Sequence, residues 1–178
     1  MANVLLAVSG GIAAHKAADV ASGLRKAGAD VNVIMTKNAC EFITPLTFEA
    51  LTGRMVYADT FDYSADTSIK HIALARQADV FAVVPATANV IAKLAHGIAD
   101  DMVTSTALAA TCPLVVCPAM NTRMYEHQVT QENLRILADR GACVVGPAAG
   151  QLACGDVAKG ALASTDEIIQ AILAKLPN

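Results

Sequence analysis

The feature that most constrains the fold of this chain is the alternation of short apolar runs with longer helical patterns. Buried strands are expected at residues 3–8, 31–36, 80–85, 113–118 and 142–147. The apolar spacing predicts helices at 11–28, 71–78, 88–97, 101–110 and 130–141, and Ser164 with Glu167 predicts a capping box before a last helix over 168–173. Because strand–helix–strand units build parallel sheets, we expect an α/β fold: a three-layer αβα, Rossmann-like (flavodoxin-like) sandwich.

Length and composition fit a single domain over residues 1–178. Apolar residues make up 54% of the chain and aromatic residues only 4%, so the core must consist mainly of Ala, Val, Ile and Leu. The net charge of -3, with no run of basic residues, gives no reason to expect a nucleic-acid partner. No apolar stretch reaches the ~20 residues of a membrane span, and the start "MANVLLAVSGG" is too short for a signal peptide. We expect a cytoplasmic protein without a membrane partner.

The chain contains five cysteines, an odd number, and no CxxC pair. A disulfide framework, a zinc site and thioredoxin-like chemistry are therefore not expected, and no metal ligands are assigned. Four of the cysteines are expected to be structural. Cys154, in "QLACGDVAKGAL", lies in a loop of small residues, where a free thiol can be a packing residue, a metal ligand, a nucleophile or a proton donor.

Ligands of open parallel sheets bind at the carboxyl ends of the strands, and three predicted strand ends carry suitable residues. "SGGIAA" (9–14) combines two glycines with a helix start that can hold a phosphate, although such a turn is also common for steric reasons alone. Thr36 and Thr87 fit an ordinary role as helix caps or turn residues, and their hydroxyls could also contact a ligand. No acidic residue ends the second strand, which favours a mononucleotide over a dinucleotide such as NAD.

The fourth predicted strand is followed by Asn121 between Met120 and Met124. An amide at this position can form a hydrogen bond with a carboxylate or a carbonyl group. Among the four histidines, His71 is singled out, at the start of the helix before the third strand. Most single histidines are structural or solvated, so His71 needs a further argument.

Together these motifs resemble the homo-oligomeric flavin-containing cysteine decarboxylases. The family's PASANT motif is similar to "PATANV" (85–90), its PxMNxxMW motif to "PAMNTRMY" (118–125), its active-site histidine to His71 in "KHIALA", and its clamp cysteine to Cys154. Thr87, Val90, Tyr125 and Ala158 depart from the residues that the family motifs predict. Four motifs in the correct order cover nearly the whole chain, and nothing in the chain is left over for a synthetase domain.

The resemblance implies a carbon–carbon lyase that uses FMN to decarboxylate 4'-phosphopantothenoylcysteine to 4'-phosphopantetheine in coenzyme A biosynthesis. The substrate would be oxidised to a thioaldehyde, lose CO2, and then be protonated and reduced. The residues implied to bind FMN are Ser9, Gly10, Gly11, Thr36, Pro85, Thr87, Ala88, Asn89 and Thr104. Those implied to bind substrate are Asn121, Met124, Ala153, Cys154 and Gly155.

Three residues are implied to be catalytic. His71 would act as a base or hydrogen-bond partner in the oxidation, Asn121 would hold the carboxylate without adding charge, and Cys154 would donate a proton. Gly155 and Gly160 are expected to make the Cys154 loop flexible. The family further implies a homo-oligomer, a trimer or a dodecamer, in which a neighbouring subunit supplies the histidine.

Several alternatives stay open. The same family contains peptidyl-cysteine decarboxylases, from which "ACGD" is expected to differ, and regulatory flavin-binding subunits, some of which lack the cysteine. Flavin prenyltransferases are expected to lack both the PAMN loop and the cysteine. A plain NAD-binding domain is disfavoured because GxGxxG is absent.

Overall fold

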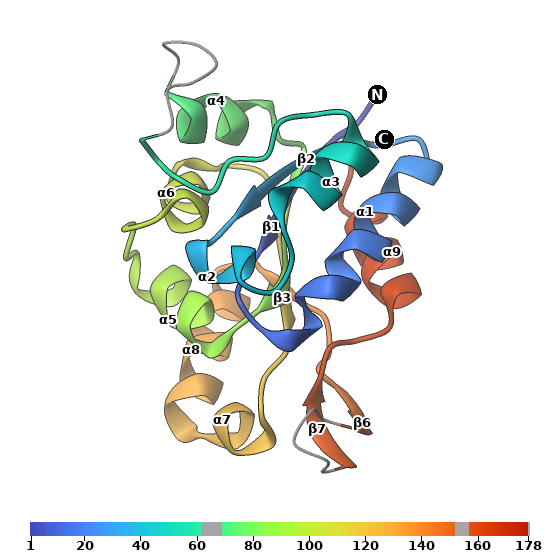
Figure 1. Cartoon of the computed structure of the whole chain (residues 1–178). Coiled ribbons are helices and arrows are strands. Elements are labelled where there is room, and N and C mark those ends of the chain that lie inside the picture. The colour runs from blue at the N-terminus through green and yellow to red at the C-terminus, as the bar shows by residue number, and fades with distance from the viewer. Residues whose placement is uncertain (62–68, 152–156, 178) are drawn as a thin grey trace.

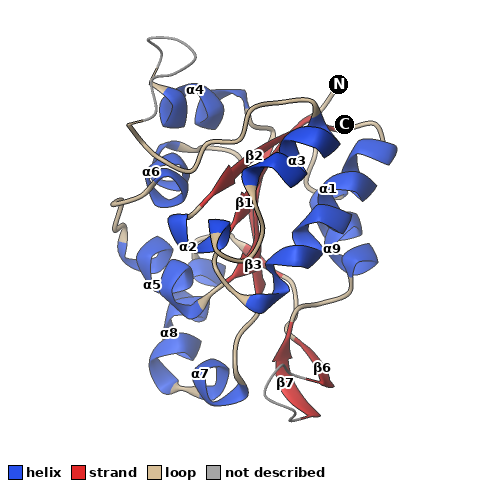
Figure 2. Ribbon diagram, in the orientation of Figure 1, coloured by secondary structure: helices blue, strands red, loops and turns tan. Residues whose placement is uncertain are grey.

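The computed structural model describes residues 1–61, 69–151 and 157–177. Its centre is a parallel sheet with the strand order β2-β1-β3-β4-β5 (Figures 1 and 2). The strands are β1 (Asn3–Val8), β2 (Asp30–Met35), β3 (Val80–Ala86), β4 (Leu114–Pro118) and β5 (Cys143–Val144). This order is that of flavodoxin-like sheets, so the predicted αβα sandwich is confirmed.

Helices cover both faces of the sheet (Figure 1). They are the 3-10 helix η1 (Ile12–His15), α1 (Lys16–Lys26), α2 (Lys37–Cys40), α3 (Pro45–Thr52), α4 (Lys70–Gln77), α5 (Ala88–His96), α6 (Met102–Ala109), α7 (Thr122–Glu126), α8 (Gln128–Asp139) and α9 (Thr165–Leu173). α1 packs against α3 and α9 on one side, and α4, α5, α6 and α8 pack on the other.

The pleat of β1 explains how the two layers are built. Val4, Leu6 and Val8 point into the core under α1, α3 and α9. Leu5 and Ala7 point to the opposite side and join the core under α4, α5, α6 and α8. Since every residue from Val4 to Val8 is buried, the strand reads as a continuous apolar run, as expected for a parallel strand covered on both faces.

Helix ends confirm part of the sequence prediction. Gly28 and Gly97 follow α1 and α5 with φ angles of +89° and +70°, which glycine adopts without strain. Ser164 accepts a hydrogen bond from the Glu167 N–H at 3.2 Å, as predicted for the start of α9. A cap at Thr130, the first residue of the helix expected over 130–141, is not observed. α8 begins earlier, His127 caps it by accepting from the Val129 N–H, and Thr130 is buried within the helix.

Other differences lie in segments with weak periodicity. β3 does not stop at Pro85 but continues to Ala86, with a register irregularity after Val83. The fifth strand is only two residues long. The antiparallel hairpin of β6 (Ala148–Gln151) and β7 (Val157–Ala161) was not predicted, because its small residues lack the β-branched and aromatic pattern of a strand.

The sheet order creates a crevice between β1 and β3. β1 connects outward to β2, whereas the chain returns on the other side of β1 to form β3 and β4. Connections that run in opposite directions from neighbouring strands leave room for a ligand at their carboxyl ends. Among the described residues, no helix is both long and apolar enough to cross a bilayer.

Candidate functional site

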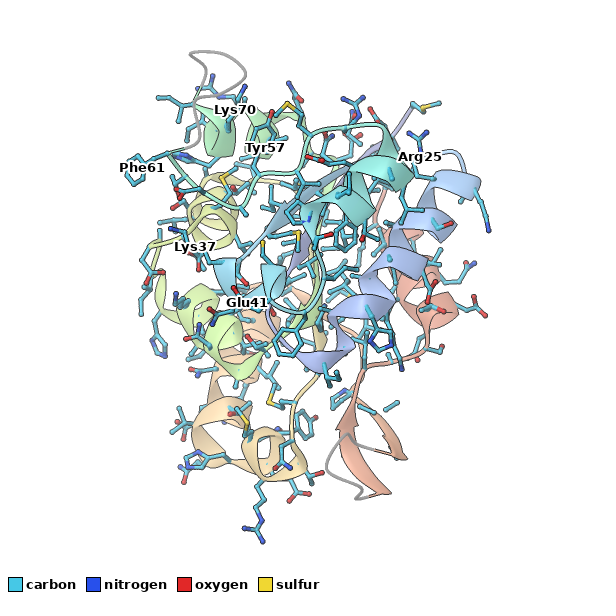
Figure 3. The ribbon with its side chains drawn as sticks, viewed as in Figure 1. Arg25, Lys37, Glu41, Tyr57, Phe61 and Lys70 are labelled. Atoms are coloured by element: carbon cyan, nitrogen blue, oxygen red, sulfur yellow. The ribbon has the colours of Figure 1, made fainter. Side chains whose placement is uncertain are left out.

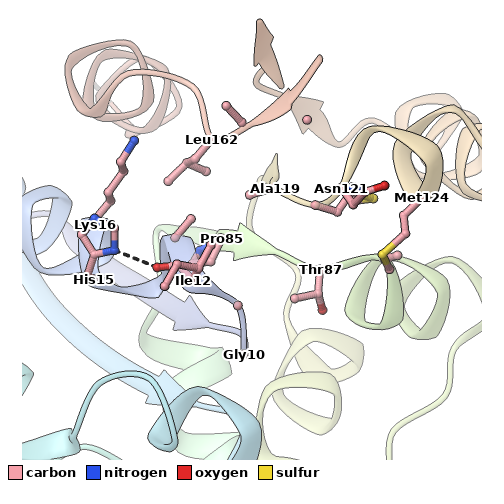
Figure 4. A pocket seen from close by; sticks show the side chains of 16 residues that line it. Gly10, Ile12, His15, Lys16, Pro85, Thr87, Ala119, Asn121, Met124 and Leu162 are labelled. Atoms are coloured by element: carbon pink, nitrogen blue, oxygen red, sulfur yellow. Dashed lines mark hydrogen bonds between the residues drawn. The ribbon is translucent and has the colours of Figure 1, made fainter. Parts of the chain in front are cut away.

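Two adjoining cavities open at this crevice. The first has a volume of about 520 Å³ and the second about 500 Å³, each within the range of small-molecule sites. Gly10, Thr87, Ala88 and Met124 line both. The two cavities therefore form one continuous region, and Figure 4 shows the first of them.

Hydrogen bonds of Ser9 hold the floor of this region. Its buried hydroxyl donates to the Pro85 carbonyl at 2.7 Å and accepts from the Thr87 N–H at 3.0 Å. The turns after β1 and β3 are therefore locked together. The Ser9 hydroxyl binds backbone groups of Pro85 and Thr87, and in this way it positions the loops that line the cavities.

The two glycines after Ser9 have different surroundings. A methyl group on Gly10 would lie 2.5 Å from Asn38 Cβ and 2.6 Å from the Asn38 carbonyl carbon, so nothing larger fits. A methyl group on Gly11 would meet only Thr87 Cγ2, at 3.7 Å, and would otherwise project into open space at the start of η1. The first N–H groups of a helix lack partners within the helix and bind anions, so this space fits a phosphate.

This contrast yields a matched pair of predictions. We expect Gly10→Ala to lower the free energy of unfolding by about 1–3 kcal/mol, because backbone must move away from the new methyl group. Gly11→Ala should change the stability of the apoprotein by less than about 0.5 kcal/mol. It should nevertheless weaken FMN binding about tenfold, by obstructing phosphate contacts. Thermal unfolding and FMN titration of both apoproteins measure these effects; unchanged FMN affinity in Gly11→Ala would contradict the phosphate assignment.

The turn after β3 combines a cap with the cavity wall. Thr87 Oγ1 accepts from the Val90 N–H at 3.3 Å and begins α5. Pro85 lines the first cavity, the exposed Asn89 lines the second, and Ala88 lines both. Thr36 likewise caps α2, through the Ala39 N–H at 3.1 Å, and also lines the second cavity. The cap and the ligand-contact interpretations are thus compatible at both threonines.

The second cavity is the more polar of the two. Lys93 Nζ contacts Asp100 Oδ1 at 2.6 Å and Asp101 Oδ2 at 3.3 Å, and all three residues line it. The hydrogen bond to Asp100, aided by both negative charges, raises the pKa of Lys93, which therefore stays protonated at neutral pH. Lys37 pairs with Asp59 at 3.1 Å on the same wall, beside the exposed Phe61 (Figure 3).

Thr104 lies behind this wall. Its hydroxyl donates to Asp101 Oδ1 at 2.8 Å within a capping box at the start of α6. Thr104 is buried and does not line either cavity, so its link to the site runs through Asp101. Contact between FMN and Thr104 stays a prediction.

The loop after β4 supplies the polar end of the first cavity. Asn121 caps α7, with its side-chain oxygen accepting from the Arg123 N–H at 2.9 Å. Because that N–H can only donate, it meets the oxygen of the Asn121 side chain; the amide nitrogen at the other end is a donor, the type of group that binds carboxylates. Met124, half exposed, stands beside Asn121 and lines both cavities (Figure 4).

Gly160 joins β7 to this loop. The Met120 N–H donates to the Gly160 carbonyl at 2.9 Å. Gly160 has a φ of +142°, and a methyl group there would lie 2.3 Å from the Met120 oxygen. Glycine is thus required here for close backbone contact, a reason different from the expected flexibility of the loop, which stays a prediction. The other residues predicted in this loop, Ala153, Cys154 and Gly155, lie outside the described residues.

His71 is the second residue of α4, as predicted, and is half-buried. It is not among the residues that line the two cavities. Its neighbour Lys70 stands over the ring of Tyr57, 5.5 Å from the centroid (Figure 3). The described part of one chain thus brings Asn121 and the predicted FMN-binding loops together, but does not bring His71 to them.

The described cysteines differ in accessibility. Burial raises the pKa of the Cys117 thiol to about 12. Burial likewise raises the pKa of Cys40 and of Cys112. No cluster of three or more His, Cys, Asp or Glu side chains in the described ranges is arranged to hold a metal ion.

Cys117 allows a pH-dependent prediction. Its folded-state pKa of about 12 exceeds the ordinary value of 9.0, so the unfolded chain releases this proton first. The stabilising contribution is complete below pH ~9 and is lost as the pH rises toward ~12. We expect native protein at pH 8 to leave Cys117 unmodified by iodoacetamide, with the denatured protein as the control. Rapid alkylation of native Cys117, detected by peptide mass spectrometry, would contradict this account.

Several lining residues were missed by the sequence analysis. Ile12, His15 and Lys16 line the first cavity from the helix after β1, and Asp59, Lys93 and Asp100 line the second. Residues 12 and 16 are four positions apart in the predicted helix, so the sequence places them on the same helix face. Asp59 follows an isolated β-bridge between Ile34 and Tyr57, and no sequence pattern predicts that bridge.

The described residues fit FMN. The space beside Gly11 suits its phosphate, and the largely apolar first cavity and polar second cavity suit a flat ring with a hydroxylated chain. The location agrees with the general rule for this strand order, which places FMN at the switch point between β1 and β3.

Comparisons with known proteins agree with this assignment. The chain is 52% identical over 168 residues to the Bacillus subtilis coenzyme A biosynthesis bifunctional protein CoaBC, covering 94% of this chain and 41% of the relative. It is 51% identical over 171 residues to a Streptococcus mutans protein named probable phosphopantothenoylcysteine decarboxylase, covering 95% of this chain and 96% of the relative. It therefore spans less than half of the first relative but nearly all of the second.

Solved structures are similar over the whole fold. A mutant PPC decarboxylase complexed with pantothenoylaminoethenethiol superposes with a TM-score of 0.87 at 32% identity, covering 97% of each chain. The FMN-dependent cysteine decarboxylase SpaF gives a TM-score of 0.84 at 34% identity, covering 98% of this chain and 96% of that one. The family model named Flavoprotein matches residues 1–177. With its flavodoxin-like sheet order and its cavities at the switch point, the chain belongs to the Flavoprotein family.

Proposed function

We propose that this protein is an FMN-dependent decarboxylase that converts 4'-phosphopantothenoylcysteine to 4'-phosphopantetheine in coenzyme A biosynthesis. The observation that carries the proposal is the joining of three loops around one cavity region: the Gly10–Gly11 turn, the Pro85–Ala88 turn and the Asn121 loop. The 51% identity to the S. mutans protein, at nearly full coverage of both chains, supports the same substrate class.

Bound FMN would supply the two-electron oxidation that turns the substrate's cysteine thiol into a thioaldehyde, and would return the electrons after CO2 has left. The new C=S group accepts the electron pair released with CO2, which gives an enethiolate. The comparison PPC decarboxylase is complexed with pantothenoylaminoethenethiol, whose name describes the enethiol form of such a compound. This agreement supports the proposed sequence of steps.

The protein's own residues would position the substrate and protonate the enethiolate. The Asn121 amide nitrogen would donate to the substrate carboxylate without adding positive charge, which matters because a cation would stabilise the carboxylate and oppose its loss. Cys154 would protonate the enethiolate carbon, since a thiol with a pKa near 8.5 is mostly protonated at neutral pH. The Gly10–Gly11 turn would hold the FMN phosphate.

The position of His71 supports a shared active site. Because His71 does not line the described cavities of its own chain, a second copy would have to bring it to Asn121. A closed homo-oligomer, a trimer or a dodecamer, repeats this arrangement at every boundary. Exposed apolar side chains on and around α4 and α6, Ile69, Ile98 and Leu108, are available for such a contact.

A second candidate is a peptidyl-cysteine decarboxylase of the same family. The 34% identity to SpaF, described as an FMN-dependent cysteine decarboxylase, is compatible with this alternative. The cavities alone do not separate the two, since both reactions act on a C-terminal cysteine.

One assay tests the function and separates the candidates. The purified protein, reconstituted with FMN, is incubated with 4'-phosphopantothenoylcysteine or with a peptide that ends in cysteine, and the released CO2 is measured. We expect yellow protein that releases CO2 from the phosphorylated compound and much less from the peptide. Colourless protein that does not take up FMN would contradict the flavin assignment, and preference for the peptide would favour the second candidate.

A further inference from the structure

The first cavity has a cationic end. Of the described residues that line it, Lys16 alone carries a permanent positive charge. Figure 4 shows Lys16 and Leu162 toward one side of the cavity and Asn121 and Met124 at the opposite side. We infer that Lys16 is a specificity-determining residue that binds the terminal phosphate of the substrate. This inference rests on the proposed function.

Lys16 is placed to bind an anion. It is half-buried at the start of α1, and no carboxylate of the described residues forms an ion pair with its Nζ. The lysines that line the second cavity are already paired, Lys93 with Asp100 and Asp101, and Lys37 with Asp59. A half-buried lysine whose ammonium group has no carboxylate partner among the described residues gains from a ligand that brings a negative charge.

The neighbours of Lys16 leave its charge available. His15 also lines the cavity, and its Nδ1–H donates to the Ile12 carbonyl at 2.7 Å, which fixes the ring against its own helix turn. Leu162, the other residue that Figure 4 labels on this side, is apolar, and no Asp or Glu is among the described residues that line the cavity. A phosphate that enters this side of the cavity would therefore meet the Lys16 ammonium group and no carboxylate of the described lining residues.

The middle of the cavity fits the rest of the substrate. Figure 4 shows Ala119 between Leu162 and Asn121, and Ala161 also lines this cavity, whereas Pro85 belongs to the predicted FMN-binding residues. Such an apolar passage suits the branched methyl groups of a pantothenoyl chain. An extended substrate whose carboxylate contacts Asn121 would direct its phosphate to the opposite end. The phosphate of FMN has a separate place, beside Gly11, so the two phosphates do not compete.

The test compares Lys16→Gln with Lys26→Gln. Lys26 lies on the same helix, is exposed and lines neither cavity, so its replacement removes the same charge far from the site. Each FMN-loaded variant is assayed with 4'-phosphopantothenoylcysteine and with pantothenoylcysteine, which lacks the phosphate. We expect Lys16→Gln to lose roughly ten- to a hundredfold in kcat/KM for the phosphorylated substrate only, the equivalent of one charged hydrogen bond. Lys26→Gln should behave as wild type with both.

Two outcomes would overturn the inference. Equal losses with both substrates, together with weaker FMN binding in an apoprotein titration, would assign Lys16 to the flavin phosphate. Unchanged kinetics of Lys16→Gln with both substrates would remove it from recognition altogether.

A binding measurement separates this inference from the proposed function. Thermal stabilisation of each FMN-loaded variant is measured with 4'-phosphopantetheine and with pantetheine. Wild type should be stabilised more by the phosphorylated compound, and Lys16→Gln should lose that difference. If wild type decarboxylates neither substrate, the proposed function fails, while this comparison still decides whether Lys16 binds the phosphate. Equal stabilisation of wild type by both compounds would contradict the inference.

Discussion

Cys154→Ser is expected to release CO2 but to stop before the reduced product forms. Serine has nearly the same shape as cysteine, but its hydroxyl is a far weaker acid, so the enethiolate would not be protonated. General-acid catalysis contributes about 10²–10⁴ in rate, and the yield of 4'-phosphopantetheine should fall by that factor. Anaerobic absorbance spectra should show flavin that stays reduced after one equivalent of substrate.

The matched control is Cys117→Ser, because Cys117 is buried within β4 and lines neither cavity. It should keep full turnover per folded molecule, with some loss of stability from a polar group in the core. If Cys154→Ser completes turnover at the wild-type rate, Cys154 is not the proton donor. Loss of CO2 release in that variant would place its role earlier in the reaction.

His71→Asn is expected to block the first oxidation. Asparagine keeps a hydrogen-bonding group of similar size but cannot exchange a proton near neutral pH. Flavin reduction by substrate should slow by about 10²–10⁴, and CO2 should not appear before it. His96→Asn is the control, because His96 contacts Asn133 at 2.9 Å between α5 and α8 and lines neither cavity. Flavin bleaching in His71→Asn at the wild-type rate would refute this role.

Mixed oligomers test whether His71 acts across a subunit boundary. Two inactive proteins, His71→Asn and Asn121→Ala, are unfolded together and refolded with FMN. If each site combines Asn121 of one chain with His71 of another, some sites in the mixture are fully wild type and activity reappears. If both residues serve the same chain, mixing restores nothing.

The sheet could be predicted from the sequence because its signal is local. The apolar runs at residues 3–8, 31–36 and 80–85 are long enough, and bounded clearly enough, to identify buried parallel strands. The alternation of strands and helices then limits the topology, and the observed order follows one of the few right-handed arrangements.

The site was predictable only where it follows a strand directly. Gly10, Thr36, Thr87 and Asn121 stand at strand ends, so their convergence could be expected. The contributions of Lys93 and Asp59 could not, because they depend on how helices and loops pack against that edge.

Gly160 shows a further limit of sequence reasoning. Glycine in a loop is often interpreted as flexibility, but here the neighbouring Met120 carbonyl leaves no room for a side chain. Met120 lies forty positions away in the chain, so no local sequence pattern shows that it excludes a side chain at residue 160. The opposite roles of Gly10 and Gly11, one packed and one open, are likewise invisible in the sequence "SGG".

The most direct test of the account is rapid anaerobic mixing of the FMN-loaded protein with one equivalent of 4'-phosphopantothenoylcysteine. Flavin absorbance and CO2 are followed on the same time scale. The account predicts that the absorbance falls, that CO2 appears, and that the absorbance then recovers as 4'-phosphopantetheine forms. Release of CO2 while the flavin absorbance stays constant throughout, at every protein concentration tested, would contradict it.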